Sequence, residues 1–578
     1  MFRLILALWL ALTGNAWAAT PAQDLLLLGG VSPSYVADLT LGYLPAGISF
    51  SRAGNAMLTD ASGKLTYAPN NLLTYSNDLT NAAWNNAGYT VSPNSVVAPD
   101  GTTTASLVTR LASGSQYVQQ GVQNIQAGVN TIVAAWAKAG TSGSLAFTGN
   151  GSLGTTTFNL NTGVSVTGSG GWVSSGTVNA GGGWWLCYAV ANVSSSQIAY
   201  FNPTSAGGTG ATNSVWHFSV SAVTYETTPR PGDQVVTGAA AYYGPRFDHS
   251  PSGAPLGLLV GASATNSALY ARDLTQSAWS KTNGTAAKDQ AGLDGVSSSA
   301  SSFTATSANA TVLQAITLAS AAYNYAVYLK RITGSGEIDV SMDGGSTWTA
   351  ATSANCSVDG VPTAINTGGY VRCSISATRA NPSIGIRLVT SGDAVAVDVA
   401  QLEAGTVATS PIITTTAALT RAPEIVALTP ATFARAVNPA QGTVFVDTFG
   451  ITNQTNYYPR ILGSSSANAL VCIDGVNGPF KAETYNGSVL EPSVVPVWSG
   501  PVRVGSRWSS SGRAIVANGG IPATDTSNTS VIPGGIWLGS GVGGTAYFLN
   551  GYILRFVVYR QALSLGQLRL KSNYGAPF

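Results

Sequence analysis

The feature that most constrains the fold of this chain is a long internal repeat. Residues 71–84, NLLTYSNDLTNAAW, recur as NSALYARDLTQSAW at 266–279, an offset of 195 residues at both ends (266 − 71 and 279 − 84). The asparagine, the tyrosine, the Asp-Leu-Thr triplet and the Ala-Trp pair coincide without a gap. Such self-similarity indicates a duplicated structural unit. The chain therefore contains two copies of one module, and we predict that Trp84 and Trp279, which keep the same place in both, are core residues.

The repeat continues with shrinking offsets. Residues 135–138 (AWAK) correspond to 327–330 (VYLK) at an offset of 192 (330 − 138), and Cys187 corresponds to Cys373 at an offset of 186 (373 − 187). The second copy has thus lost nine residues (195 − 186) between its first and last landmarks. Loops vary in length more readily than strands, so the losses are expected in loops.

Both copies have the sequence pattern of β-strands. In 394–400, AVAVDVA, valine alternates with small or polar residues over the length of a strand. Charged residues form only 9% of the 578 residues, and 67 glycines punctuate short β-branched and aromatic runs, which is typical of strands joined by turns. A chain of this length also exceeds what one hydrophobic core supports. We predict an all-β protein whose two copies are tandem jelly-roll β-sandwiches.

The landmarks set the expected domain boundaries. Jelly-roll module 1 is predicted at 71–231, a connecting segment at 232–265, and jelly-roll module 2 at 266–421. The remaining 422–578 has strand-like runs separated by Gly-rich turns, followed by a short final helix that Ser564 is expected to cap.

The N-terminal sequence predicts that the protein is exported. One basic residue, an apolar run at 4–12 and Ala-Trp-Ala at 16–18 form the pattern of a signal peptide, expected at 1–18. An N-terminal leader or anchoring segment is expected at 19–70. No later apolar run approaches the length of a transmembrane helix, so no membrane span is predicted.

Several motifs of the repeat resemble a known family. They are Asn-Leu-Leu-x-Tyr-Ser-x-Asp-Leu at 71–79, Phe-Ser-Arg-Ala at 50–53, Pro-Arg-Phe-Asp at 245–248 and Gln-Leu-Glu-Ala-Gly at 401–405. Together they resemble the carbohydrate-binding-like modules of bacteriophage head-spike, tail-fibre and related virion proteins. The first copy departs from the pattern, because it reads Ala-Val-Thr-Tyr-Glu at 222–226 in place of the last motif. Residues 422–578, with Leu-Asn-Gly-Tyr-Ile at 549–553, resemble a concanavalin A-like, laminin G-type sandwich.

The resemblance implies a non-enzymatic virion fibre or spike protein, or an exported surface protein, that adsorbs to a bacterial or other cell-surface glycan. Its expected partners are that glycan, neighbouring virion or surface proteins, and further copies of the chain, as in a trimer. Its expected location is the virion or the extracellular space. The signal peptide favours an exported bacterial protein with no virus involved. The sequence is also compatible with an architectural decoration protein that binds only protein neighbours, and with a polysaccharide depolymerase.

Charge and residue pattern argue against other functions. Lys and Arg total 26 and Asp and Glu 24, so the net charge of +2 does not suggest a nucleic-acid-binding surface. His217 and His249 lie near no nucleophile motif, and no zinc-ligand spacing is present. The acids are scattered and indicate no pair of glycosidase carboxylates. We therefore expect no enzymatic activity, no catalytic residue and no cofactor.

Sugar binding needs an aromatic face for the C–H side of a pyranose and polar groups for its hydroxyls. The candidates are aromatic residues in strand-like runs and one arginine, although most strand tryptophans are core residues. They are Trp184, Trp185 and Tyr188 in module 1, Tyr370 in module 2, and Tyr457, Tyr458 and Arg460 in 422–578.

Four cysteines do not form a disulfide framework. Cys356 and Cys373, 17 residues apart (373 − 356), could pair across neighbouring strands if the protein is oxidised, whereas Cys187 and Cys472 are expected to be buried. The turn acids of Asp100-Gly101 and Asp359-Gly360 could serve a structural calcium ion. Turn chemistry alone explains both, and no metal site is predicted.

Overall fold

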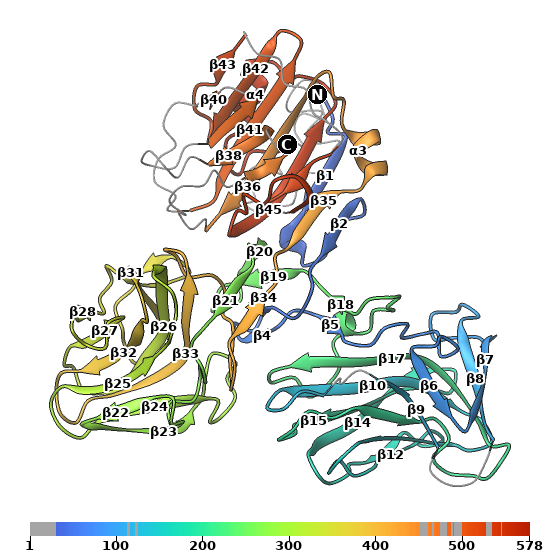
Figure 1. Ribbon diagram of the computed structural model, residues 1–578. Coiled ribbons are helices and arrows are strands. Elements are labelled where there is room, and N and C mark those ends of the chain that lie inside the picture. The colour runs from blue at the N-terminus through green and yellow to red at the C-terminus, as the bar shows by residue number, and fades with distance from the viewer. Residues whose placement is uncertain are drawn as a thin grey trace, which may run out of the picture. The chain divides into compact units, whose positions relative to one another are not determined.

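The computed structural model describes residues 31–111, 116–121, 125–450, 460–464, 468–473, 482–486, 489–490, 500–526, 535–544 and 546–578. The predicted signal peptide and the first residues of the predicted leader lie outside these ranges. The chain forms two compact units, one of the residues up to Ser49 with Ile425–Phe578 and the other of Phe50–Glu424. We call them the C-terminal unit and the tandem unit (Figure 1). The prediction of an all-β protein is confirmed, since antiparallel strands dominate both.

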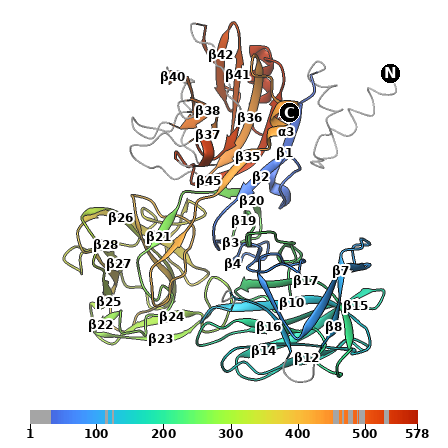
Figure 2. The ribbon, with the colours of Figure 1, turned by 45° about the vertical axis from the view of Figure 1, so that its right-hand side comes forward.

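Module 1 is a sandwich of two antiparallel sheets within the tandem unit. Its strands are β6 (Trp84–Ala87), β7 (Tyr89–Val96), β8 (Ala105–Arg110), β9 (Tyr117–Gln120), β10 (Asn130–Ala139), β11 (Ser144–Gly149), β12 (Thr156–Asn159), β13 (Val164–Val166), β14 (Trp172–Gly181), β15 (Trp184–Ala191), β16 (Ala199–Asn202) and β17 (Thr212–Val223). One sheet has the order β14-β15-β10-β17-β8-β7 and the other β13-β12-β11-β16-β9-β6. Figure 2 shows strands of both sheets, among them β10 and β17 of the first and β12 and β16 of the second. Its main core contains side chains from both sheets, such as Val133 of β10 and Phe147 of β11.

Module 2 repeats this topology. Its strands are β22 (Ser280–Thr282), β23 (Gly284–Gln290), β24 (Ala300–Ala305), β25 (Ala310–Ala315), β26 (Ala321–Thr333), β27 (Ile338–Ser341), β28 (Thr349–Ala350), β29 (Cys356–Val358), β30 (Val361–Pro362), β31 (Val371–Arg379), β32 (Ser383–Leu388) and β33 (Ala394–Ala404). The sheet orders are β30-β29-β31-β26-β33-β24-β23 and β28-β27-β32-β25-β22. Each strand of module 1 except β13 therefore has a counterpart at the same place in module 2.

The shared motif at the start of each copy fastens the chain to the last strand of its own module. Asn71 and Asn266 are fully buried, and each side chain donates to two carbonyls and accepts from two N–H groups. The partners are Phe218, Val235, Leu73 and Val220 for Asn71, and Ala400, Ile412, Ala268 and Leu402 for Asn266. In each module the repeated asparagine therefore links the first residues of the module to its last strand through hydrogen bonds.

The tryptophans of the repeat are core residues, as predicted. Trp84 and Trp279 are 5% and 2% exposed. Their indole N–H groups donate to the carbonyls of Tyr75 (2.9 Å) and Tyr270 (3.3 Å), again one repeat apart.

The hydrogen bonds also correct the alignment of the last motif. The carbonyls bound by the two asparagines, in Phe218 and Ala400, are 182 residues apart (400 − 218). Residues 219–223, rather than 222–226, are therefore the counterpart of 401–405. Gln401 and Glu403 fix the following loop, because Gln401 accepts the N–H of Ile412 (2.8 Å) and Glu403 accepts that of Thr409 (2.8 Å). The motif has a structural role in module 2.

Short strands join the two modules within the tandem unit. They are β3 (Met57–Thr59), β4 (Leu65–Tyr67), β5 (Asn70–Asn71), β18 (Tyr242–Tyr243), β19 (Arg246–His249), β20 (Pro255–Val260), β21 (Ala264–Asn266) and β34 (Leu419–Arg421), with the 3-10 helix η2 (Pro231–Asp233). They form the antiparallel pairs β3–β4, β5–β18, β19–β20 and β21–β34.

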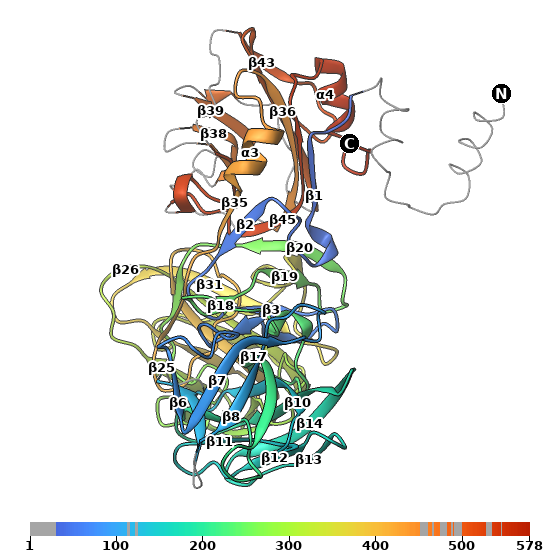
Figure 3. The ribbon, with the colours of Figure 1, turned by 90° about the vertical axis from the view of Figure 1, so that its right-hand side faces the viewer.

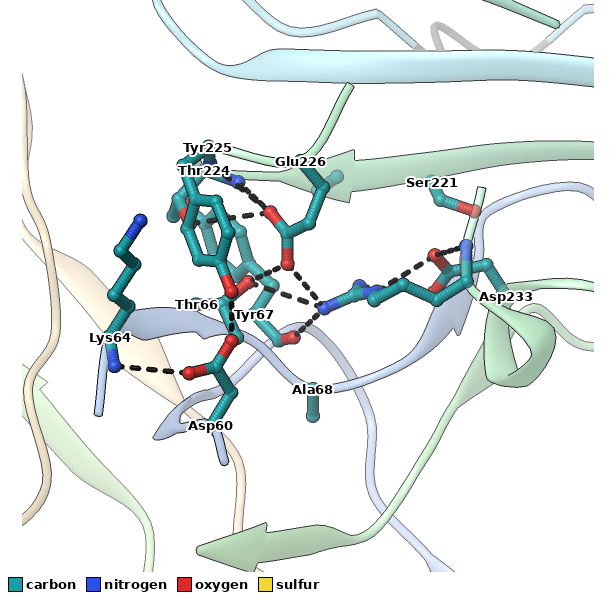
Figure 4. A network of polar contacts seen from close by, with 12 residues as sticks. Asp60, Lys64, Thr66, Tyr67, Ala68, Ser221, Thr224, Tyr225, Glu226 and Asp233 are labelled. Carbon is teal, nitrogen blue, oxygen red and sulfur yellow. Dashed lines mark hydrogen bonds and ion pairs between the residues drawn. The ribbon is translucent and has the colours of Figure 1, made fainter. Parts of the chain in front are cut away.

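A polar network fastens the end of module 1 to the chain that precedes it (Figure 4). Arg230 forms ion pairs with Glu226 (2.9 Å) and Asp233 (2.9 Å) and donates to the carbonyl of Tyr67 (2.8 Å). The hydroxyl of Tyr225 donates to Asp60. These carboxylates therefore stabilise the contact between the end of module 1 and the chain segment that precedes the module.

The C-terminal unit contains two further sheets. Its elements are β1 (Tyr35–Asp38), η1 (Leu39–Leu41), β35 (Ile425–Leu428), α3 (Pro430–Ala436), β36 (Gly442–Phe449), β37 (Arg460–Gly463), β38 (Asn468–Ile473), β39 (Ala482–Asn486), β40 (Val489–Leu490), β41 (Val502–Ser509), β42 (Gly512–Ala517), β43 (Ala523–Asp525), β44 (Trp537–Leu538), η3 (Val542–Gly544), β45 (Gly551–Tyr559) and α4 (Leu565–Lys571), while β2 (Ile48–Ser51) spans the boundary between the units. One sheet runs β1-β45-β36-β41-β42-β43 and the other β35-β44-β37-β38-β39-β40.

Two elements of the C-terminal unit, β1 and α4, lie in segments for which the sequence makes a prediction. β1 pairs with β45 (Figure 3), so the predicted leader contributes a strand here. The predicted final helix is confirmed, since Ser564 accepts the N–H of Gln567 (3.2 Å) and caps α4. No helix in the described ranges is long and apolar enough to cross a membrane.

Candidate functional site

An open recess of about 390 Å³ lies on module 1, where β14 turns into β15. We call it the module 1 recess. Its lining combines one indole, one ammonium group, two carboxamides and a run of glycines. The lining residues are Lys138, Ala139, Leu160, Asn161, Asn179, Gly181, Gly182, Gly183 and Trp185.

A run of three glycines borders the recess. Gly181, Gly182 and Gly183 have φ angles of 79°, 58° and 83°, which are left-handed conformations that favour glycine. A Cβ atom at Gly181 or Gly182 would meet no other atom within 4 Å. The turn between β14 and β15 therefore borders the recess with backbone alone.

Trp185 is the aromatic side of the recess, and its ring is held in one orientation. The indole N–H donates to the carbonyl of Leu160 (2.9 Å). Gly163 packs against the six-membered ring so closely that a Cβ there would lie 2.4 Å from it. The side chain is half-buried and also packs against the main core of module 1. Its orientation is thus fixed by the fold before any ligand arrives.

The polar lining comes from three separate segments. Lys138 lies near the end of β10, in register with Trp184 of β15. Asn161 follows β12, and Asn179 near the end of β14 accepts the N–H of Gly181 (2.8 Å). An ammonium group and two carboxamides supply donors and acceptors beside the indole. This arrangement suits a ligand that offers one apolar face and several hydroxyl groups.

Only one of the three aromatic residues predicted in module 1 lines the recess. Trp184 is 4% exposed, and its indole N–H donates to the carbonyl of Val97 (3.2 Å), so it is a core residue. Tyr188 packs with Ile132 and Leu186 in a separate apolar cluster. Lys138, Asn161 and Asn179 did not emerge from the sequence, because nothing in their local pattern distinguishes them from other surface residues.

Module 2 differs at the corresponding positions. Strand register makes Lys330 and Tyr370 the counterparts of Lys138 and Trp184. The hydroxyl of Tyr370 donates to the carbonyl of Ala291 (2.9 Å), and the Lys330 ammonium lies 5.1 Å from the Tyr370 ring centroid. The counterpart of Trp185 is Val371, which is 1% exposed in the core. Module 2 therefore lacks the indole on which the recess depends.

The candidates in the C-terminal unit do not form a described site. Tyr457 and Tyr458 lie outside the described residues. Arg460 is 5% exposed, its guanidinium lies 4.4 Å from the ring centroid of Tyr547, and its backbone N–H donates to the carbonyl of that residue (2.9 Å).

The cysteines and turn acids have structural surroundings. Cys356 and Cys373 form a disulfide (S–S 2.09 Å), and Cys187 and Cys472 are buried. Asp100 accepts the N–H of Thr102 (2.9 Å), as a turn residue does. Within the described ranges, no group of three or more His, Cys, Asp or Glu residues is placed to hold a metal ion.

The second turn acid, Asp359, has an unusual environment. Burial, together with the neighbouring charge of Asp248, raises the pKa of Asp359 to about 6. Bringing a positive charge to Asp359 would lower that pKa again.

No protein-family model and no curated protein sequence matches the chain. Among solved structures, it is similar to the CBM22-1-CBM22-2 tandem domain of Xyn10C from Paenibacillus barcinonensis, at 11% identity over 59% of this chain and 98% of that chain, with a TM-score of 0.22. It is also similar to domain 4 of AbnA, an extracellular GH43 arabinanase from Geobacillus stearothermophilus, at 15% identity over 25% of this chain and 71% of that domain, with a TM-score of 0.21.

A sialidase from Trypanosoma rangeli is similar at 9% identity over 94% of this chain and 98% of that chain, with a TM-score of 0.21. At identities and TM-scores this low, none of these likenesses carries an inference about ligand or activity.

Proposed function

We propose that this chain is a non-enzymatic carbohydrate-binding protein and that the module 1 recess is its binding site. The observation that carries the proposal is the fixed, half-buried indole of Trp185 beside Lys138, Asn161 and Asn179. A pyranose presents an apolar C–H face that packs on an indole and hydroxyl groups that bond to ammonium and carboxamide groups. Few other classes of small ligand combine these two features.

The open shape of the recess suggests weak individual binding. A shallow site covers only part of a sugar, so the affinity of one recess should be low. The small net charge of +2 supplies no strong electrostatic steering. Useful avidity would then arise from several copies of the chain acting on one repetitive glycan.

We assign different roles to the two modules. Module 1 has the recess, whereas Val371 of module 2 is core, and the hydroxyl of Tyr370 bonds to backbone. In this proposal module 1 binds and module 2 acts as a spacer or scaffold. This difference in roles rests on one pair of equivalent residues, because Trp185 of module 1 corresponds to Val371 of module 2.

The proposed setting is a cell surface or a virion surface. The sequence motifs at 71–79, 245–248 and 401–405 resemble those of phage spike and fibre modules, and the N-terminus has the pattern of an export signal. We propose a bacterial or other cell-surface glycan as the ligand and adsorption as the role. Homo-oligomers would supply the avidity, with neighbouring surface or virion proteins as further partners.

The first test is binding of the chain that starts at Ala19 to an array of bacterial surface glycans, with release of reducing ends followed in the same wells. Binding without release is the expected result. Release of reducing ends would establish a depolymerase. Absence of both binding and release would favour a purely architectural protein.

A further inference from the structure

Three arginines surround a single glutamate inside the tandem unit. Arg246 forms a two-point ion pair with Glu424 (2.7 and 2.9 Å), while Arg52 (3.2 Å) and Arg421 (3.3 Å) each add one contact. All four side chains are buried, with residue exposures of 8% or less. We call these four residues the arginine cluster.

The arginine cluster has an excess of positive charge. Three guanidinium groups meet one carboxylate, and that carboxylate also accepts the N–H of Gly261 (2.9 Å). Glu403 is near enough to act on Arg421, but its carboxylate bonds to Thr409 at 2.8 and 2.6 Å. Glu424 is therefore shared by all three guanidinium groups, and among the residues described the cluster carries two more positive than negative charges.

Two guanidinium nitrogens of the cluster also lack hydrogen-bond partners. Within the described part of the chain, neither Nη2 of Arg52 nor Nε of Arg421 has an acceptor. By contrast, Nη1 of Arg246 bonds to the hydroxyl of Ser410, and Nε of Arg52 donates to the carbonyl of Gly54 (2.9 Å). A buried guanidinium donor without an acceptor is strongly unfavourable.

Burial and mutual repulsion act on the pKa values in the same direction. Burial, followed by the charge of Arg246, lowers the pKa of Arg421 to about 10. Burial lowers the pKa of Arg52 to about 10, although the charge of Glu424 opposes that effect. Both groups still carry a proton at neutral pH, so the excess positive charge persists under ordinary conditions.

We propose that the arginine cluster binds a small monovalent anion of the halide class, with chloride as the natural occupant. The anion would accept from Arg52 Nη2 and Arg421 Nε and offset part of the excess charge. Full burial favours a compact, weakly hydrated ion over a bulky carboxylate or phosphate ester. Because the cluster joins segments at 52, 246 and 421–424, the bound anion would stabilise the joint between the two modules.

The test is thermal unfolding of the full chain at constant ionic strength, with sodium chloride or bromide replacing sodium gluconate. A ligand that binds only the folded state raises the melting temperature by mass action. We expect a rise of several degrees that saturates at millimolar halide. In Arg421→Gln the rise should shrink to less than half, whereas Arg379→Gln, in the partly exposed pair with Asp343, should keep it.

Crystals grown in bromide supply a second measurement that does not depend on the folding of a variant. An anomalous bromine peak within hydrogen-bond distance of Arg52 and Arg421 would support the proposal. A melting temperature that does not respond to halide, together with no peak at the cluster, would overturn it and leave water as the partner of the two nitrogens.

Discussion

Thr177 of β14 lies directly opposite Cys187 of β15, in the position that Cys356 holds opposite Cys373 in module 2. The two pairs occupy the same place in equivalent sheets, but only module 2 has both cysteines. The disulfide is therefore one of the differences between two sandwiches of the same topology.

We predict that Thr177→Cys forms a disulfide with Cys187 under oxidising conditions. The new loop is short, so the expected gain in stability is about 2 kcal/mol, seen as a higher melting temperature that dithiothreitol reverses. Mass spectrometry of the unreduced chain would locate the bond. Val178→Cys is the control, because Val178 is in register with Leu186 and should leave Cys187 as a thiol.

The repeated asparagines predict matched losses of stability. Asn71→Ala and Asn266→Ala each remove four hydrogen bonds to buried backbone groups, so each should cost about 3 kcal/mol. Asn366 is exposed, and Asn366→Ala should change stability by less than about 0.5 kcal/mol. Thermal unfolding of the three variants measures the difference. Equal effects of all three would contradict the role assigned to the motif.

The C-terminal unit depends on a buried ion pair. Arg503 binds Asp447 through two contacts (2.6 and 2.9 Å), and the two side chains are 0% and 1% exposed. Asp447→Asn leaves a buried guanidinium without its counter-charge and should cost about 3–5 kcal/mol in urea unfolding. The partly exposed pair of Arg555 and Asp38 offers the comparison, and Asp38→Asn should cost no more than about 1 kcal/mol.

The burial of His217 should make the protein less stable in mild acid. Burial lowers the pKa of His217 from 6.5 to about 4, although its Nε2 contact with the Val235 carbonyl opposes that effect. The unfolded chain therefore binds a proton that the folded chain does not between pH 6.5 and about 4. Above pH 6.5 the contribution of His217 to the free energy of unfolding should be constant. As the pH falls from 6.5 to about 4, the free energy of unfolding should decrease by about 3 kcal/mol because of this group.

His217→Asn is the variant that checks this origin. The backbone at His217 has a φ of 46°, which asparagine tolerates better than most residues. Melting temperatures measured from pH 4 to pH 8 should show a shallower acid slope in the variant than in the native chain. Identical slopes would assign the acid sensitivity to other groups.

The repeat predicted the double sandwich because its landmark residues make the same contacts twice. Asn71 and Trp84 are recognisable in sequence since Asn266 and Trp279 bond to equivalent backbone groups. The pairing of 222–226 with 401–405 was wrong because it matched sequence letters, whereas the hydrogen bonds to Phe218 and Ala400 fix the true register.

The site was harder to predict because it depends on contacts between distant segments. Alternate residues of a strand face opposite sides of a sheet, but the sequence does not say which side is covered. Trp184 is buried with its indole bonded to the backbone of Val97, far away in the chain. Lys138, Asn161 and Asn179 come together only once three separate segments are in place.

The central claim is that the module 1 recess binds carbohydrate, and paired variants test it most directly. The affinity for whichever glycan the array identifies would be measured by titration calorimetry for the native chain, for Lys138→Gln with Asn161→Ala, and for Lys330→Gln. We expect at least a tenfold loss in the double variant, with an unchanged melting temperature, because both altered side chains line the recess. Lys330→Gln, its counterpart in module 2, should bind like the native chain. Unchanged affinity in the double variant, or loss of affinity in Lys330→Gln, would contradict the assignment of the site to module 1.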